Sequence, residues 1–143
     1  MLQQVSKNFI IQEFVNKELF IAFGNNSIWF VDHRIIQFCQ WLRDYLGKSI
    51  TINNWHVGGN YNESCFRLPD TMTGAKLSQH KFGRAVDLKI DGYTPEEIRG
   101  IIRKNFDLVN VNYGITTIEK ETPSWTHVDC RFTGLNKIFE VNG

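Results

Sequence analysis

The chain has 143 residues, of which 42% are hydrophobic and 22% are charged, and its formal net charge is +1. This is the composition of an ordinary globular protein, and residues 1–143 suffice for a single domain that buries a core without disulfides. Because no arm or face is visibly enriched in lysine and arginine, the sequence argues against a nucleic-acid-binding protein.

The first half of the chain predicts two helices. Apolar spacing over residues 9–17 fits a short helix, and Gly-Asn-Asn at residues 24–26 predicts a turn. The clearest helix spans residues 33–46, where apolar side chains recur at helical intervals. Asp32 is its expected N-cap, Gly47 ends it, and its apolar side should pack on a sheet.

A strand and a long loop are expected next. Residues 48–55 alternate and include β-branched side chains, which predicts the first core strand. Residues 56–77 are rich in Gly, Asn, Thr, Ser and Asp, so we expect a long loop that carries Arg67. Loops of this length inside a compact domain are uncommon and usually functional.

Strand patterns recur in four segments of the second half, residues 84–90, 108–119, 124–132 and 137–141. Between the first two, a capping box that begins at Thr94, with Pro95 at the first helical position, predicts a helix to about Phe106. The fold should therefore be α+β, a small antiparallel sheet with helices packed mainly on one face and a cleft on the other.

A metal site is the main functional prediction. His80 and Asp87 form a short-range pair, and His127 follows 40 residues after Asp87. This pattern is typical of a catalytic zinc ion that keeps its fourth position open for water. Gly83 should allow the tight turn that brings both members of the pair to one ion. The alternative for the pair is a hydrogen-bonded contact on the surface of a turn.

Strand alternation places these side chains in a cleft. Asp87 lies opposite the apolar positions of its strand, so it should point away from the core. In the strand of His127, alternate positions share a polar face that includes Asp129. Asp129 is expected to orient a ligand histidine, and its alternative role is to pair with Arg84 or Arg131.

Three more side chains are candidates for substrate binding. Arg67 can offer a guanidinium fork to a substrate carboxylate or carbonyl, or it can brace its own loop. Ser78 can hydrogen-bond substrate or cap the turn before His80. Trp125 can form part of the wall of the cleft, or it can only pack against neighbouring side chains.

The cysteines and the first residues bear on the compartment. Cys39, Cys65 and Cys130 are odd in number and lack Cys-x-x-Cys spacing, which favours reduced, mostly buried thiols over a disulfide framework. Charged residues interrupt the apolar positions of residues 1–20, so no signal peptide is expected. No stretch approaches the length of a membrane span. We therefore expect synthesis in the cytoplasm.

The motifs also carry a family resemblance. The pattern SxHxxGxAxD at residues 78–87, followed by WxHxD at residues 125–129, resembles the zinc D-Ala-D-Ala carboxypeptidase family of the hedgehog/DD-peptidase fold. That family includes the dipeptidases of vancomycin resistance and the L-alanyl-D-glutamate endopeptidases of phage endolysins. Residues 64–67 resemble the family's Ser-Gly-Tyr-Arg, with Cys65 where the family has glycine. The resemblance covers roughly residues 9–132.

This resemblance implies a zinc metallopeptidase that hydrolyses peptidoglycan stem peptides, as a carboxypeptidase or an endopeptidase. It also implies a carboxylate that takes a proton from water and returns it to the leaving amine. In the peptidases that acid usually lies three positions before the last histidine, where this chain has Ser124. The hedgehog branch places a glutamate six positions before, which makes Glu121 the predicted base, with Glu119 close in sequence. By default, a glutamate at a loop end is only a solvated charge.

A second hypothesis competes with the enzyme. Ser124 in place of an acid and Cys65 in place of glycine favour a non-catalytic, zinc-binding structural or partner-binding module, for example of a virion. Under the first hypothesis the expected partner is the stem peptide, and a monomer without nucleic acid or membrane partner is expected. The protein would then act on the cell wall after release, as in phage-type lysis, or as a virion component.

Overall fold

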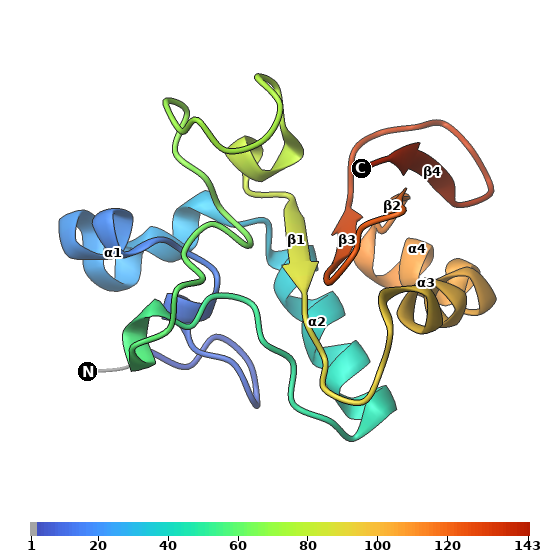
Figure 1. The fold of residues 1–143 in the computed structure, drawn as a ribbon, viewed down its shortest axis with the longest axis horizontal. Helices are drawn as coiled ribbons and strands as arrows, with labels where there is room; N and C mark the ends of the chain where they lie inside the picture. Colours follow the sequence, from blue (N-terminus) through green and yellow to red (C-terminus); the bar gives the residue numbers. More distant parts are fainter. Residues whose placement is uncertain (1–2) are drawn as a thin grey trace.

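The computed structural model describes residues 3–143 and has an α+β fold (Figure 1). Its helices are α1 (Lys17–Phe23), α2 (His33–Leu46), α3 (Pro95–Lys104) and α4 (Phe106–Tyr113). Its strands are β1 (Ala85–Leu88), β2 (Thr117–Lys120), β3 (Thr126–Asp129) and β4 (Phe139–Asn142). Four short 3-10 helices complete the described elements: η1 (Ile11–Glu13), η2 (Gly24–Phe30), η3 (Trp55–Val57) and η4 (Gln79–Phe82).

The strands form one mixed sheet in the order β1-β3-β2-β4. β3 pairs antiparallel with both β1 and β2, but β4 pairs parallel with β2. The prediction of a wholly antiparallel sheet is therefore wrong at one edge. The reason is the connection after β3. β3 ends at Asp129 beside Thr117, the start of β2, and residues 130–138 lead to Phe139, which pairs with the same Thr117 from the other side, so β4 runs in the direction of β2.

Local signals explain α2 and α3, whose predictions are confirmed. The Asp32 side chain accepts a hydrogen bond from the Arg34 backbone N–H, and Gly47 ends α2 in the left-handed conformation, with φ 62°. Thr94 caps α3 through a capping box with Glu97. The start of both helices and the end of α2 are thus set by residues that cap them.

Three other segments differ from their predictions. Residues 9–17 do not form one helix: Ile11–Glu13 form η1, and α1 begins only at Lys17. Residues 48–54 form no strand, only a single bridge between Thr51 and Lys89. The Asn53 side chain there bonds the backbones of Val15 and Ser64, which replaces strand pairing by side-chain contacts. Residues 106–113 form α4 rather than a strand, because packing against α2 selects the helix from a short apolar run that fits either structure.

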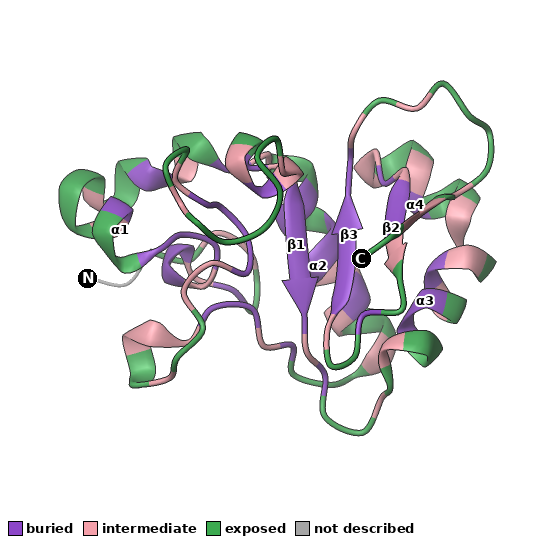
Figure 2. Cartoon of the chain, turned by 45° about the horizontal axis from the view of Figure 1, so that its top comes forward, coloured by how far each residue is buried: buried purple, intermediate pink, exposed green. Residues whose placement is uncertain are grey.

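The sheet separates the core from a polar face. Buried apolar side chains of the even-numbered strand positions join those of α2, α3 and α4 in one cluster: Val86, Leu88, Ile118 and Val128. Figure 2 shows these buried strands lying over α2 and α4. Odd-numbered positions of the same strands point to the other side, where a cavity lies. Cys39, Cys65 and Cys130 are buried and free, as expected.

Candidate metal centre

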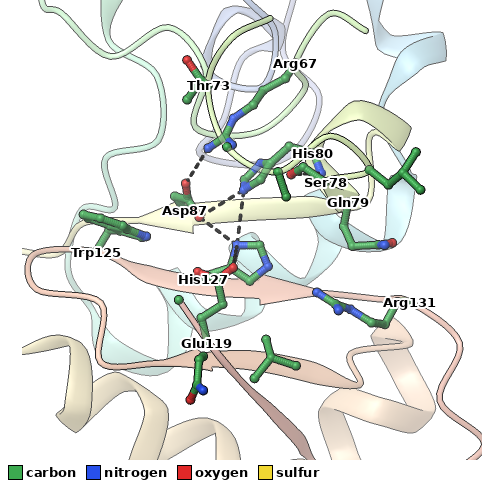
Figure 3. Close-up of a pocket in the computed structure, with 16 residues that line it drawn as sticks. Arg67, Thr73, Ser78, Gln79, His80, Asp87, Glu119, Trp125, His127 and Arg131 are labelled. Atoms are coloured by element: carbon green, nitrogen blue, oxygen red, sulfur yellow. Dashed lines mark hydrogen bonds and ion pairs between the residues drawn. The ribbon is translucent and has the colours of Figure 1, made fainter.

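A cavity of about 610 Å³ lies on the polar face of the sheet. Asp87 of β1 and His127 of β3 stand directly opposite each other in the strand register and both line the cavity. Glu119 of β2 lies two residues beyond Thr117, which pairs with Asp129, so it also approaches His127. Three neighbouring strands therefore deliver side chains to one place (Figure 3).

The 3-10 helix η4 brings His80 to the same cavity. Ser78 caps η4 by accepting a hydrogen bond from the His80 backbone N–H at 3.3 Å. Gly83 ends η4 with φ 69°, and a Cβ at this position would lie 1.8 Å from the Phe30 carbonyl oxygen. Only glycine fits this turn, because both the backbone conformation and the contact with η2 exclude a side chain.

The three predicted ligands form a nearly equilateral triangle of donor atoms. Asp87 Oδ1 lies 3.0 Å from His127 Nδ1 and 3.2 Å from His80 Nε2, and the two histidine nitrogens are 3.2 Å apart. In a tetrahedral zinc site with bonds of about 2.0–2.1 Å, ligand atoms are separated by about 3.3 Å. The triangle therefore has the size of one face of such a tetrahedron. All three side chains are buried, and together they could hold a metal ion.

One segment, residues 64–67, fixes two of these ligands. The Ser64 carbonyl accepts a hydrogen bond from the Asp87 backbone N–H at 2.6 Å, and the Arg67 backbone N–H donates to the His80 carbonyl at 3.0 Å. His80 Nδ1 donates to the Cys65 carbonyl at 2.7 Å, which leaves His80 Nε2 as the nitrogen free to bind a metal. Arg67 Nη2 donates to Asp87 Oδ2 at 3.1 Å, so the other carboxylate oxygen faces the histidines.

Asp129 fixes the third ligand. His127 Nε2 lies 2.8 Å from Asp129 Oδ2, and the carboxylate can only accept, so the nitrogen carries the proton. His127 Nδ1 therefore faces the triangle. Arg131 Nε donates to Asp129 Oδ1 at 2.8 Å and holds that carboxylate in turn. Partners of this kind orient ligand imidazoles in metal sites.

The charges of these groups follow from their contacts. Burial raises the pKa of Asp87, but hydrogen bonds from His127 and His80 outweigh it and hold that pKa well below its usual range. Burial lowers the pKa of His127, yet its bonds to Asp129 and Asp87 raise it to about 9. Burial also opposes ionisation of Asp129, whose pKa falls to about 2 beside Arg131 and His127. At neutral pH His127 is therefore protonated in the ion-free protein, and a metal ion that binds the triangle would replace this proton.

The structure brings Glu119, and not Glu121, to the centre. Glu119 Oε1 lies 3.8 Å from His127 Nδ1. Glu121, the base expected from sequence, is exposed and does not line the cavity. β2 ends at Lys120, and Glu121 has a left-handed φ of 62°, so the strand alternation that would have turned it toward the cavity stops before it.

The other predicted residues also line the cavity. Arg67 lies at its wall, with its Nε donating to the Glu63 carbonyl at 2.7 Å, and Ser78 and Trp125 lie around it. Arg131, for which the sequence predicts only a pairing with Asp129, lines the cavity as well. Arg131 lies two residues after Asp129 and four after His127, and this alternation predicts that its side chain points to the same face as theirs.

Comparison with protein-family models, with curated proteins and with solved structures finds no match. Within residues 3–143, no helix is long and apolar enough to span a membrane.

Proposed function

We propose that this protein is a zinc-dependent metallopeptidase that hydrolyses peptidoglycan stem peptides. The observation that carries the proposal is the triangle of His80, Asp87 and His127 beside the carboxylate of Glu119 in one open cavity. The resemblance of the SxHxxGxAxD and WxHxD patterns to the D-Ala-D-Ala carboxypeptidase family supports the choice of substrate. A hedgehog/DD-peptidase-like arrangement, with action in phage-type cell-wall lysis, belongs to the same proposal.

The donor set supports zinc. Two imidazole nitrogens and one carboxylate oxygen suit Zn²⁺ among the common metal ions, and three protein ligands are typical of catalytic rather than structural zinc. When bound there, zinc would polarise the scissile carbonyl and lower the pKa of water, so that a hydroxide nucleophile is available at neutral pH. Asp129 and the Cys65 carbonyl keep the two imidazoles in the tautomers that such binding requires.

Glu119 takes the role of general base in this proposal. Its carboxylate stands 3.8 Å from the ligand atom of His127, within the distance that one water molecule bridges. It would accept a proton from the attacking water and return it to the leaving nitrogen. Arg67 is buried and fixed by Asp87 and the Glu63 carbonyl, so its guanidinium would hold a substrate carbonyl or carboxylate at low entropic cost.

One observation favours the alternative of a non-catalytic zinc module. The same 3.8 Å separation would let Glu119 swing in as a fourth ligand. Four protein ligands would close the site, as in structural zinc centres. The two functions therefore differ in what Glu119 contacts once zinc is present.

The test is hydrolysis of purified peptidoglycan by zinc-loaded protein, with released amines measured by mass spectrometry. His80→Ala and Glu119→Gln should each abolish cleavage, and Glu119→Gln should still bind one zinc ion. Glu121→Gln is the matched control, because it makes the same chemical change at an exposed carboxylate outside the cavity and should retain activity.

Two outcomes would contradict the proposal. A wild-type protein shown to hold one zinc ion that cleaves nothing would favour the structural module. If Glu119→Gln instead lowered zinc affinity as strongly as His80→Ala, Glu119 would be a ligand rather than a base.

A further inference from the structure

A second hollow adjoins the metal cavity. It has a volume of about 240 Å³ and is lined by residues 60–64 together with Arg67 and Asp87. Arg67 and Asp87 line the metal cavity too, so the contact between their side chains, 3.1 Å long, stands between the two spaces. The two spaces therefore share this ion pair as a common wall, and Asp87 is the one candidate ligand that lines both.

The wall of the second hollow is held firmly. The Tyr61 carbonyl accepts hydrogen bonds from the backbones of Asn54 and Trp55, and the Tyr61 backbone N–H donates to the Asn54 side chain at 2.9 Å. The Asn62 side chain accepts from the Lys17 backbone N–H at 2.9 Å. A wall that is already ordered loses little entropy when a ligand contacts it.

The polar lining fits a peptide segment. The Tyr61 side chain is partly exposed, and the Lys89 ammonium lies 4.0 Å from its ring centroid, so the ring is fixed at the surface. Asn60 is exposed beside it, and amide side chains can both donate to and accept from a peptide backbone. Pockets that enclose a whole ligand measure about 300–1,000 Å³, so a hollow of this size suits part of a chain whose remainder lies elsewhere.

We infer that the substrate lies across the Arg67–Asp87 pair, with residues on both sides of the scissile bond, and that the enzyme is an endopeptidase. The inference rests on the proposed function and narrows it. Selective release of a terminal residue needs a site that ends at that residue and rejects longer chains. Here the second hollow, on the other side of the Arg67–Asp87 pair, gives a longer chain room to continue past the metal cavity.

The reaction is a simple hydrolysis. The amide C–N bond breaks, the water oxygen bonds to the acyl carbon, and the water protons go to the leaving nitrogen and to solvent. The products are two shorter peptides, one ending in a new carboxylate and the other beginning with a new amine, and nothing is oxidised or reduced.

Fragment masses from the peptidoglycan digest give the first test. We expect every cleaved bond to have further residues on both sides, and no single amino acids to be released. Release of single amino acids alone would overturn the inference and leave the metallopeptidase standing. No cleavage at all by protein that holds one zinc ion would overturn both.

Binding gives a second test that does not depend on turnover. The probe is a synthetic peptide spanning the cleaved bond identified by the fragments, titrated by calorimetry into Glu119→Gln protein. Adding Tyr61→Ala should weaken binding about fivefold to tenfold, the range for loss of one aromatic contact. A peptide shortened on the side that occupies the second hollow should bind both proteins equally.

Tyr45→Ala is the matched control. Tyr45 is exposed to a similar degree, 47% against 42% for Tyr61, and also contacts one neighbouring side chain, Trp41. It lines neither space, so its loss should leave peptide affinity unchanged. Unchanged affinity in the Tyr61→Ala protein for the full-length peptide would overturn the assignment of the second hollow.

Discussion

Replacing Gly83 by alanine should damage both folding stability and zinc binding. A Cβ at this position would lie 1.8 Å from the Phe30 carbonyl oxygen, whereas real Cβ contacts stay beyond 3.0 Å. The two backbones must therefore separate by about 1.2 Å, and the left-handed φ adds about 1–2 kcal/mol of its own. Together with the disturbed packing between η2 and η4, we expect a loss of about 2–4 kcal/mol in the free energy of unfolding.

The same shift reaches the metal centre. Gly83 follows His80 within one turn of η4, and its backbone N–H donates to the His80 carbonyl at 3.2 Å. Binding sites tolerate displacements of only about 0.5 Å, so zinc affinity should fall by at least tenfold. Urea unfolding of the metal-free protein gives the first quantity, and competition with a chromogenic chelator gives the second.

Gly47→Ala is the matched control for this prediction. Gly47 has almost the same conformation, with φ 62°, but a Cβ there meets nothing within 4 Å. It should therefore show the conformational cost alone, about 1–2 kcal/mol, with zinc affinity unchanged. Equal losses of stability in the two variants, or full zinc affinity in Gly83→Ala, would refute the reasoning from the Phe30 contact.

Three further outcomes are expected. Asp129→Asn should lower zinc affinity by about tenfold to a hundredfold, because it weakens the contact that orients His127; unchanged affinity in the chelator assay would contradict this. In the ion-free protein His127 has a pKa of about 9, above its ordinary value, so its contribution to folding stability is present below pH 6.5 and lost as pH rises through about 9. Because zinc must displace this proton, zinc affinity should rise with pH up to about pH 9, and calorimetry in buffers of different ionisation enthalpy should detect proton release. A zinc affinity that does not change between pH 7 and pH 9 would contradict this. Thr94→Ala should cost about 1 kcal/mol in urea unfolding through loss of the α3 cap, with zinc affinity unaffected.

Sequence reasoning succeeded where the determining contacts are local. The bounds of α2 follow from Asp32 and Gly47, which act within one turn of the helix. The metal triangle was equally accessible, because strand alternation decides the direction of Asp87 and His127, and their pairing in the register brings them together. The direction of each side chain depends on spacing within its own strand, which the sequence displays directly, whereas the pairing of β1 with β3 is seen only in the structure.

The failures come from contacts between distant segments. Residues 48–55 have strand-forming side chains, but Asn53 bonds Val15, 38 residues earlier, and the pairing is limited to one bridge. Which glutamate faces the cavity, Glu119 or Glu121, depends on where β2 ends. A left-handed Glu121 cannot be deduced from a glutamate in a loop, because that conformation is rare for residues other than glycine.

The contact between His80 and the Cys65 carbonyl changes how position 65 should be compared among proteins. What this position supplies to His80 is a main-chain oxygen, which every amino acid possesses. A cysteine where the resembling family has glycine therefore does not by itself favour the non-catalytic module over the enzyme, because the contact with His80 does not involve the side chain of residue 65. Here the backbone path, rather than the residue type, is what natural selection would have to preserve.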